Sequence, residues 1–133
     1  MKKLLILTSI VLLFSTCDNE NELMSNQELL IGTWEDSGED TKGAFKHQFT
    51  FTDTNEFTEI FEGYQFKDVG FETIKEPFNN TYHGTYQADN SIITFTYVNI
   101  ESANSTGKAD YSINGNTLIM SYRNMTLTFK KVN

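Results

Sequence analysis

Few side chains in this chain are able to do covalent or acid–base chemistry. Its 133 residues include one cysteine, Cys17, and two histidines, His47 and His83. A single thiol cannot form an intramolecular disulfide, and neither histidine lies in a recognised local motif with a serine or cysteine nucleophile. The histidines also lack the spacing to other ligand residues that is typical of metal sites. The sequence therefore predicts that the protein is not an enzyme and holds no metal or cofactor.

Cys17 stands directly after a segment with the features of a secretory signal. Two lysines precede a mostly apolar run over residues 4–14, which is shorter than the ~20 residues of a membrane span. Residues 14–17, Phe-Ser-Thr-Cys, resemble a bacterial lipobox, whose cysteine thiol receives diacylglycerol and becomes the mature N-terminus. The resemblance implies a lipoprotein with a signal peptide over residues 1–17 and palmitate-type acyl chains that anchor Cys17 in a membrane. An ordinary signal peptide followed by a free cysteine is the alternative.

A short acidic segment follows this cysteine. Residues 18–22 read Asp-Asn-Glu-Asn-Glu, and residues 18–28 are expected to form a disordered tether. Acidic residues at this place resemble the surface-export signal of lipoproteins in Bacteroidota, which implies an anchor in the outer membrane of the cell envelope and exposure at the cell surface. An aspartate in the first position resembles an inner-membrane retention signal of enteric bacteria, so both locations stay open.

The charge of the chain excludes one class of partner. Ten basic residues are outnumbered by 18 acidic ones, for a formal net charge of −8, and so acidic a chain repels nucleic acid. The acid is concentrated, because residues 18–76 hold 15 of the 18 acidic residues against four lysines. This half predicts either a well-solvated surface or a face for a cationic protein or divalent ions.

The elements that must position these groups are strands. Runs of alternating apolar and polar residues cover residues 29–35, 45–52, 56–62, 80–87, 91–99, 109–113, 118–122 and 125–129. His47 falls on the apolar face of its run, where we expect a core histidine that is hydrogen-bonded through one ring nitrogen. Ile60 breaks the alternation and predicts a bulge or an early strand end there. Residues 64–74 fit no regular pattern.

The connections between these runs indicate the topology. Asn55 and Asn114-Gly115 are expected in tight turns, and residues 23–30 are the one segment able to form a helix, with Ser25 and Glu28 as its capping box. Tight turns make sequence neighbours into sheet neighbours. The sequence thus predicts an all-β fold, a small antiparallel up-and-down barrel of eight or nine strands over residues 29–133. An open sandwich is the alternative.

A family resemblance appears at the start of the first strand. Gly32-Thr33-Trp34 resembles the Gly-x-Trp opening of lipocalins. The order and spacing of the later motifs resemble the short lipocalin-like domains of Bacteroidota lipoproteins; these motifs are Phe49-Thr50-Phe51, Gly84-Thr85-Tyr86, Ile93-Thr94-Phe95 and residues 111–118. The resemblance covers residues 29–132. It implies a lipocalin-like barrel whose floor Trp34 closes, beneath a basic residue that could be Arg123, Lys130 or Lys131.

The inward face of such a barrel carries many large side chains. The candidate ligand-binding residues are Trp34, Phe49, Phe57, Tyr86, Phe95, Tyr111, Met120 and Phe129. They predict a non-catalytic module that binds a small apolar or amphipathic ligand, in a narrow aromatic pocket smaller than the ~300 Å³ of drug-sized sites. One alternative is a protein-binding or inhibitory module in which residues 18–76 engage a cationic partner. Another is an accessory subunit without a ligand of its own.

Overall fold

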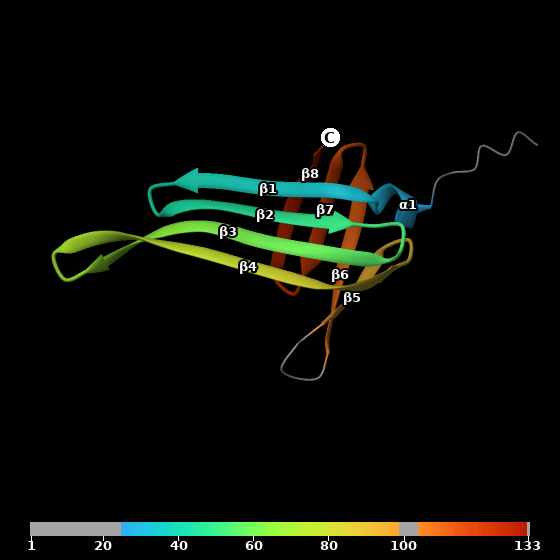
Figure 1. Ribbon diagram of the computed structural model, residues 1–133. Helices are drawn as coiled ribbons and strands as arrows, with labels where there is room; N and C mark the ends of the chain where they lie inside the picture. The colour runs from blue at the N-terminus through green and yellow to red at the C-terminus, as the bar shows by residue number, and fades with distance from the viewer. Residues whose placement is uncertain (1–24, 99–103, 133) are drawn as a thin grey trace, which may run out of the picture.

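Eight antiparallel strands preceded by one short helix make up the part of the chain that the structure describes. The computed structural model describes residues 25–98 and 104–132. Its elements are α1 (Asn26–Leu30), β1 (Gly32–Asp40), β2 (Gly43–Phe51), β3 (Glu56–Val69), β4 (Glu72–Ala88), β5 (Ile92–Tyr97), β6 (Ser105–Asn114), β7 (Thr117–Tyr122) and β8 (Met125–Val132). Each strand pairs with the next, and β1 also pairs with β8, so the sheet closes (Figure 1). The predicted all-β, up-and-down barrel is confirmed, with eight strands.

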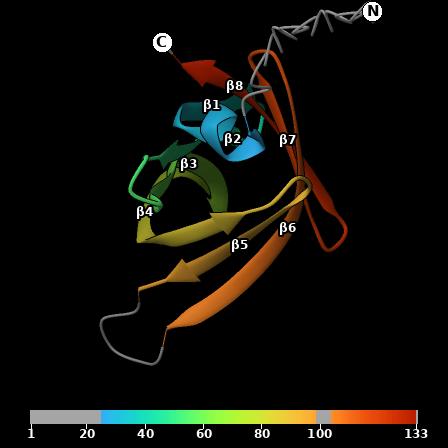
Figure 2. The same ribbon diagram turned by 90° about the vertical axis from the view of Figure 1, so that its right-hand side faces the viewer.

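Helix α1 begins with the capping box that the sequence predicts. The hydroxyl of Ser25 accepts the N–H of Glu28 at 3.3 Å, and the Glu28 carboxylate accepts the N–H of Ser25 at 2.9 Å. Leu30 is fully buried, so this single turn packs onto one end of the barrel (Figure 2). The expected tether therefore overlaps α1 from Asn26 onward, and residues 18–24 lie outside the described residues. No helix in the described segments is long and apolar enough to cross a membrane.

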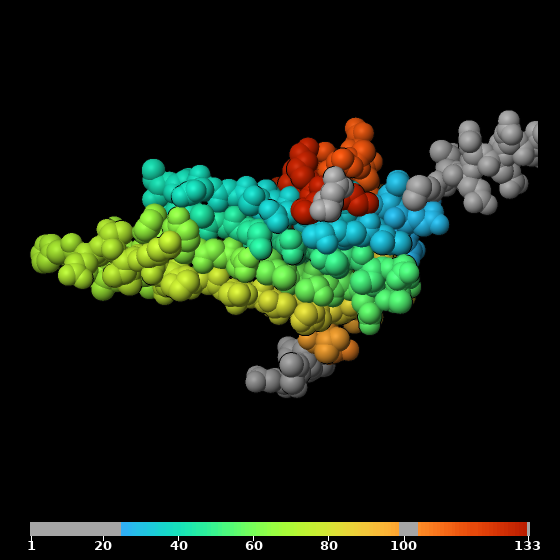
Figure 3. Space-filling view, turned by 45° about the horizontal axis from the view of Figure 1, so that its top comes forward, coloured from blue at the N-terminus to red at the C-terminus, as the bar shows by residue number. Residues whose placement is uncertain are grey.

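The two halves of the sheet differ in length. Strands β3 and β4 have 14 and 17 residues, whereas β5 and β7 have six each. β1 pairs with β8 through Thr33–Glu35, and β4 pairs with β5 through Gly84–Ala88. Beyond these pairs, residues 36–46 and 61–80 project from the barrel as a four-stranded extension, here called the arm, which stands clear of β5–β8 (Figures 1 and 3).

The arm corrects one expectation and explains another. Strand β3 runs through Ile60 without interruption, paired with Gln48 and Thr81, so the predicted bulge or strand end there is wrong. Ile60 simply lies on the opposite face of β3 from the buried Phe57. Residues 64–74 form the tip of the arm, which reverses at Gly70, a residue with φ of +68°. Apolar side chains do not alternate at the tip because both of its faces meet solvent.

Two predicted turns are confirmed. Asn55 takes a φ of 61° in the connection between β2 and β3, as its short polar side chain allows. The hairpin at Asn114-Gly115 is also present, with Gly115 at φ of 57° and Asn116 between the paired ends of β6 and β7. These turns hold the register that places the next inward residue of each strand in the core.

The barrel interior is a packed aromatic core. All eight candidate ligand-binding residues are buried, none more than 5% exposed. The Phe49 ring stacks on Phe51 at 5.7 Å between centroids and meets Phe129 edge-on at 5.5 Å. The predicted inward register is correct for every one of these positions.

The floor of the barrel decides between the three basic candidates. Trp34 is fully buried, and its indole Nε1–H donates to the carbonyl of Leu30 at 2.7 Å. The Lys131 ammonium lies 5.0 Å from the centroid of the Trp34 ring and donates to the Leu29 carbonyl at 3.3 Å. Arg123 instead lies over the Tyr122 ring at the other end of the barrel. Lys131 is therefore the basic residue beside Trp34.

Candidate functional site

A cavity of about 440 Å³ opens at the end of the barrel opposite α1. Helix α1 closes the other end of the barrel. There the Asn26 side chain donates to the Asn90 carbonyl at 2.7 Å, and the Gln27 side chain donates to the Asn55 side chain at 2.5 Å. The cavity is lined from the far ends of the strands by His47, Phe49, Glu59, Phe95, Tyr97, Ser105–Ala109, Met120, Tyr122, Met125 and Leu127. We call this cavity the mouth.

The mouth is larger than the sequence predicted. The expectation of a pocket below ~300 Å³ rested on counting large inward residues, and it is wrong. On β6 the inward positions opposite Phe95 and Ile93 are Gly107, which has no side chain, and Ala109, which has a single methyl group. These two residues leave the space open. An atom placed at the Cβ position of Gly107 would meet nothing closer than the Tyr97 ring, at 3.9 Å.

The structure divides the eight candidate residues into two groups. Phe49, Phe95 and Met120 line the mouth and form its apolar floor. The others are core residues that do not reach the cavity; they are Trp34, Phe57, Tyr86, Tyr111 and Phe129. Tyr111, for example, donates its hydroxyl to the Asp89 carbonyl near the closed end of the barrel. An inward-facing position on a strand therefore does not by itself distinguish residues that line the mouth from residues of the packed core.

One wall of the mouth is polar and comes from three different strands. The Glu59 carboxylate on β3 lies 2.8 Å from Nε2 of His47 on β2, and it accepts the Tyr97 hydroxyl of β5 at 3.1 Å. The side chains of His47 and Glu59 are 13% and 15% exposed. Burial, followed by the charge of Glu59, raises the pKa of Tyr97 well above its ordinary value, so the phenol stays a neutral donor. This set is called the polar wall.

Sequence reasoning found one member of the polar wall and missed two. His47 is inward-facing and hydrogen-bonded through one ring nitrogen, as predicted. Glu59 was overlooked although the signal was available, because it lies between Phe57 and Phe61 on the same face of its strand. The alternation of residues 91–99 places Tyr97 on the same face as the buried Phe95, but Tyr97 was not among the candidate ligand-binding residues.

Aromatic rings hold the polar wall in place. The His47 ring lies 5.0 Å from the Phe49 ring, 5.3 Å from Phe61 and 5.2 Å from Phe129, measured between centroids. The Tyr97 ring meets Phe57 edge-on at 5.1 Å. With both donors fixed by packing, the Glu59 carboxylate is presented to the cavity in one orientation. Such a group can bind a cation or a hydrogen-bond donor next to an apolar surface.

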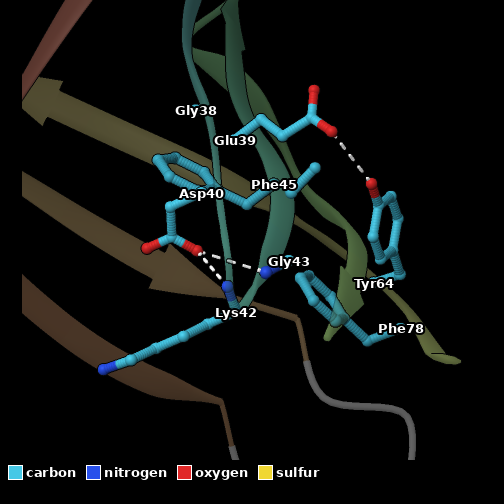
Figure 4. Close-up of a pocket in the computed structure, with 9 residues that line it drawn as sticks. Gly38, Glu39, Asp40, Lys42, Gly43, Phe45, Tyr64 and Phe78 are labelled. Carbon is cyan, nitrogen blue, oxygen red and sulfur yellow. Dashed lines mark hydrogen bonds between the residues drawn. The ribbon is translucent and has the colours of Figure 1, made fainter. Parts of the chain in front are cut away.

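A second hollow of about 420 Å³ lies on the arm, beside Phe45 and Phe78 (Figure 4). It is more open than the mouth. Its acidic groups are engaged by the arm itself: Asp40 accepts the N–H groups of Lys42 and Gly43 at 2.7 and 3.2 Å, and Glu39 accepts the Tyr64 hydroxyl at 3.2 Å. The Asp40 contacts stabilise the turn between β1 and β2, and the Glu39 contact joins β1 to β3. Because these carboxylates already have partners in the arm, the mouth is the better candidate site.

The second histidine, His83, does not line the mouth. His83 is exposed, and its Nδ1 lies 3.2 Å from the hydroxyl of Thr58 on the outer face of the barrel. Over residues 25–98 and 104–132, no cluster of three His, Cys, Asp or Glu side chains is arranged to hold a metal ion. Cys17, the predicted lipid attachment site, lies outside the described residues.

Similarity to known proteins does not assign the chain to a family. The geometry of the mouth therefore carries the functional conclusion. No family model matches the sequence, and neither a characterised protein nor a solved structure shows significant similarity to it.

Proposed function

We propose that this protein is a lipid-anchored, lipocalin-like module that binds a small amphipathic ligand in the mouth of its barrel, without catalysing a reaction. The observation that carries the proposal is the cavity of about 440 Å³, with its floor of Phe49, Phe95 and Met120 and its single polar wall. Ligand sites typically have volumes of ~300–1,000 Å³, mostly apolar linings and a few fixed polar groups. Lys131 beside Trp34 adds support for the lipocalin-like comparison.

The anchor is the second part of the proposal. A diacylglycerol on Cys17 would hold the protein at the outer membrane, and the described chain begins at α1, on the closed end of the barrel. That arrangement lets the mouth face away from the bilayer. In cells fed a fatty-acid analogue, we expect label on the wild type and none on Cys17→Ser, since a serine cannot replace the thiol. Equal labelling of the two would refute lipidation at Cys17.

The binding proposal is tested by filling the mouth from its open side. Gly107→Leu should project into the cavity, because the Cβ position has free space toward Tyr97. The matched control is Ser112→Leu, which lies exposed on the same strand. We would titrate 4-phenylbutan-1-ol, an apolar ring with a neutral hydroxyl, into the full chain in phosphatidylcholine nanodiscs and measure the heat against empty nanodiscs.

We expect saturable binding to the wild type and to Ser112→Leu, and affinity at least tenfold weaker in Gly107→Leu. Equal affinity in the wild type and Gly107→Leu would place the ligand elsewhere. No saturable heat from the wild type with this alcohol, nor with its amine and acid analogues, would overturn the proposed function. Circular dichroism and the urea midpoint establish that each variant is folded.

The arm supports a second candidate, in which the protein binds a cationic partner protein. Its tip exposes Phe66, Val69, Phe71 and Ile74 beside the acidic Asp68 and Glu72. Apolar groups rimmed by acid favour a basic partner. With hen egg-white lysozyme as a basic probe, binding should weaken between 20 and 300 mM salt and should be lost in Asp68→Lys/Glu72→Lys. Salt-insensitive binding would contradict this candidate.

A further inference from the structure

The polar wall gives the mouth a negative charge. Among the described residues that line the cavity, Glu59 supplies the one carboxylate, and its side chain is 15% exposed. The Tyr97 hydroxyl donates a hydrogen bond to this carboxylate at 3.1 Å, and Nε2 of His47 lies 2.8 Å from it. A charge in such a partly buried place is screened far less than one at the surface, so it acts strongly on whatever enters.

Lys108 does not offset this charge. Lys108 is an exposed residue, and it alternates along β6 with the inward-facing Gly107 and Ala109, so its side chain lies on the outer face of the strand. The backbone N–H groups of Ser91 and Ile92 lower the pKa of Asp89, and the Lys108 ammonium adds to this from the outer surface. Arg123 lies over the ring of Tyr122 but is not itself among the residues that line the cavity. A ligand with a carboxylate head would therefore meet Glu59 inside the cavity, and like charges brought together in a binding site are strongly unfavourable.

The aromatic lining favours the opposite charge. The rings of Phe49, Phe95, Tyr97 and Tyr122 border the same cavity as the Glu59 carboxylate. Aromatic faces attract ammonium groups, and an aromatic lining that includes an acidic group is a common solution for recognising organic cations. Met120 and Leu127, which also line the cavity, provide an apolar surface for the remainder of such a ligand.

We infer that the mouth selects an amphipathic organic cation, an ammonium group on a short apolar tail or ring, with Glu59 as its counter-ion. This inference rests on the proposed function and specifies the ligand class. It predicts that the mouth binds an amine in preference to a carboxylic acid with the same apolar tail, whereas an apolar pocket alone would bind the two equally.

The test compares three probes that share one tail and differ in the head group. These are 4-phenylbutylamine, 4-phenylbutan-1-ol and 4-phenylbutyrate, titrated at pH 8 and 150 mM salt into the full chain in phosphatidylcholine nanodiscs, with empty nanodiscs as reference. We expect the amine to bind at least tenfold more tightly than the butyrate, with the alcohol between them.

The variant Glu59→Gln keeps the size of the side chain and removes its charge. The amine should lose at least tenfold in affinity there, while the alcohol is nearly unchanged. Glu56→Gln is the matched control, since Glu56 is an exposed acid on the same strand and does not line the mouth. If Glu56→Gln weakens the amine as much as Glu59→Gln does, the cation is held by the general acidity of the surface and the inference fails.

The outcomes separate this inference from the proposed function. If all three probes bind equally and Gly107→Leu abolishes the binding, the mouth is a ligand site without charge selection, and only the inference is overturned. If none of them binds, the proposed function fails as well. Should Glu59→Gln not fold, the ranking of the three probes on the wild type decides the question by itself.

Discussion

Strands β2 and β3 run from the arm into the barrel, and the same alternation of residues leads to different burial in the two regions. On the arm, Phe45 and Phe61 are 38% and 37% exposed, whereas Phe49 and Phe57 inside the barrel are 4% and 2% exposed. All four face the same side of the sheet. The difference is the second layer of strands, because β5–β8 cross the barrel end and leave the arm uncovered (Figure 1). Alternation decides which face of a strand is apolar, and closure of the sheet decides whether that face is buried.

The candidate site lies at the boundary between the arm and the closed barrel. His47 and Glu59 are the inward residues of β2 and β3 at this boundary. Each lies two residues along its strand from a packed phenylalanine, Phe49 or Phe57. There the barrel still excludes most solvent, yet the core no longer fills the space. A carboxylate can be partly buried and hydrogen-bonded at such a position, while an apolar ligand can still enter.

The barrel and the arm should differ most in the stability that is lost when a large aromatic residue is replaced by alanine. Trp34→Ala should lower the free energy of unfolding by about 3–5 kcal/mol, because it removes a fully buried ring and its hydrogen bond from the barrel floor. Phe71→Ala at the tip of the arm should change it by less than about 0.5 kcal/mol, since that ring is fully exposed. Urea unfolding curves measure both. Similar losses in the two variants would mean that the arm is covered in solution.

Glycines give the next contrast. A Cβ at Gly84, in the barrel, would lie 2.1 Å from the carbonyl oxygen of Thr96 and 2.8 Å from the Phe57 ring. Gly84→Ala should therefore cost about 1–3 kcal/mol through overpacking. Gly70 on the arm has free space around it, so Gly70→Ala should cost only about 1 kcal/mol, from its positive φ. A midpoint for Gly84→Ala at or above that of Gly70→Ala would contradict the close approach of β4 and β5.

Two lysines over aromatic rings sharpen the comparison at a smaller scale. Lys131 lies over the buried Trp34, and Lys75 lies 3.6 Å from the centroid of the half-buried Tyr64 ring on the arm. We expect Lys131→Met to lose about 1 kcal/mol of stability and Lys75→Met to lose about 0.5 kcal/mol or less, because water reaches the pair on the arm more readily than the pair at the barrel floor. Paired thermal and urea midpoints would test the order. A larger loss in Lys75→Met would contradict the assignment of Lys131 to the barrel floor.

The smallest expected effect is a pH dependence at the closed end of the barrel. The Asp89 carboxylate accepts the N–H groups of Ser91 and Ile92 at 2.9 and 2.8 Å, which holds its pKa below the ordinary 3.8. The unfolded chain therefore binds the proton more readily than the folded chain. The ionised Asp89 carboxylate adds to the free energy of unfolding in full above about pH 4, and this stabilisation is lost as the pH falls through the lowered pKa.

Asp89→Asn should accordingly be slightly less stable than the wild type at pH 6, with the gap closing at pH 3. Asp110→Asn, which removes an exposed acid on β6, is the control for the loss of one negative charge. Urea midpoints at the two pH values measure this. A constant gap for Asp89→Asn would show that the ionised carboxylate adds nothing to the turn.

Much of the barrel was determined by short stretches of sequence. The alternation in β2 placed Phe49 and Phe51 in the core, and positive-φ residues such as Asn55 and Gly115 set the turns. Ser25 and Glu28 start the helix through contacts three residues apart. Each of these depends on neighbours in the chain, so local pattern was enough to predict strand faces, connections and the antiparallel order.

The tertiary structure alone decided the site. Lys131 was one of three equivalent basic residues until the pairing of β1 with β8 set it over Trp34. The mouth exists because Gly107 on β6 lies opposite Phe95 on β5, and its polar wall because Glu59 meets partners 12 and 38 residues away along the chain. A cavity is volume left unfilled between side chains of several strands, so it depends on packing across the barrel, which no local pattern of residues contains.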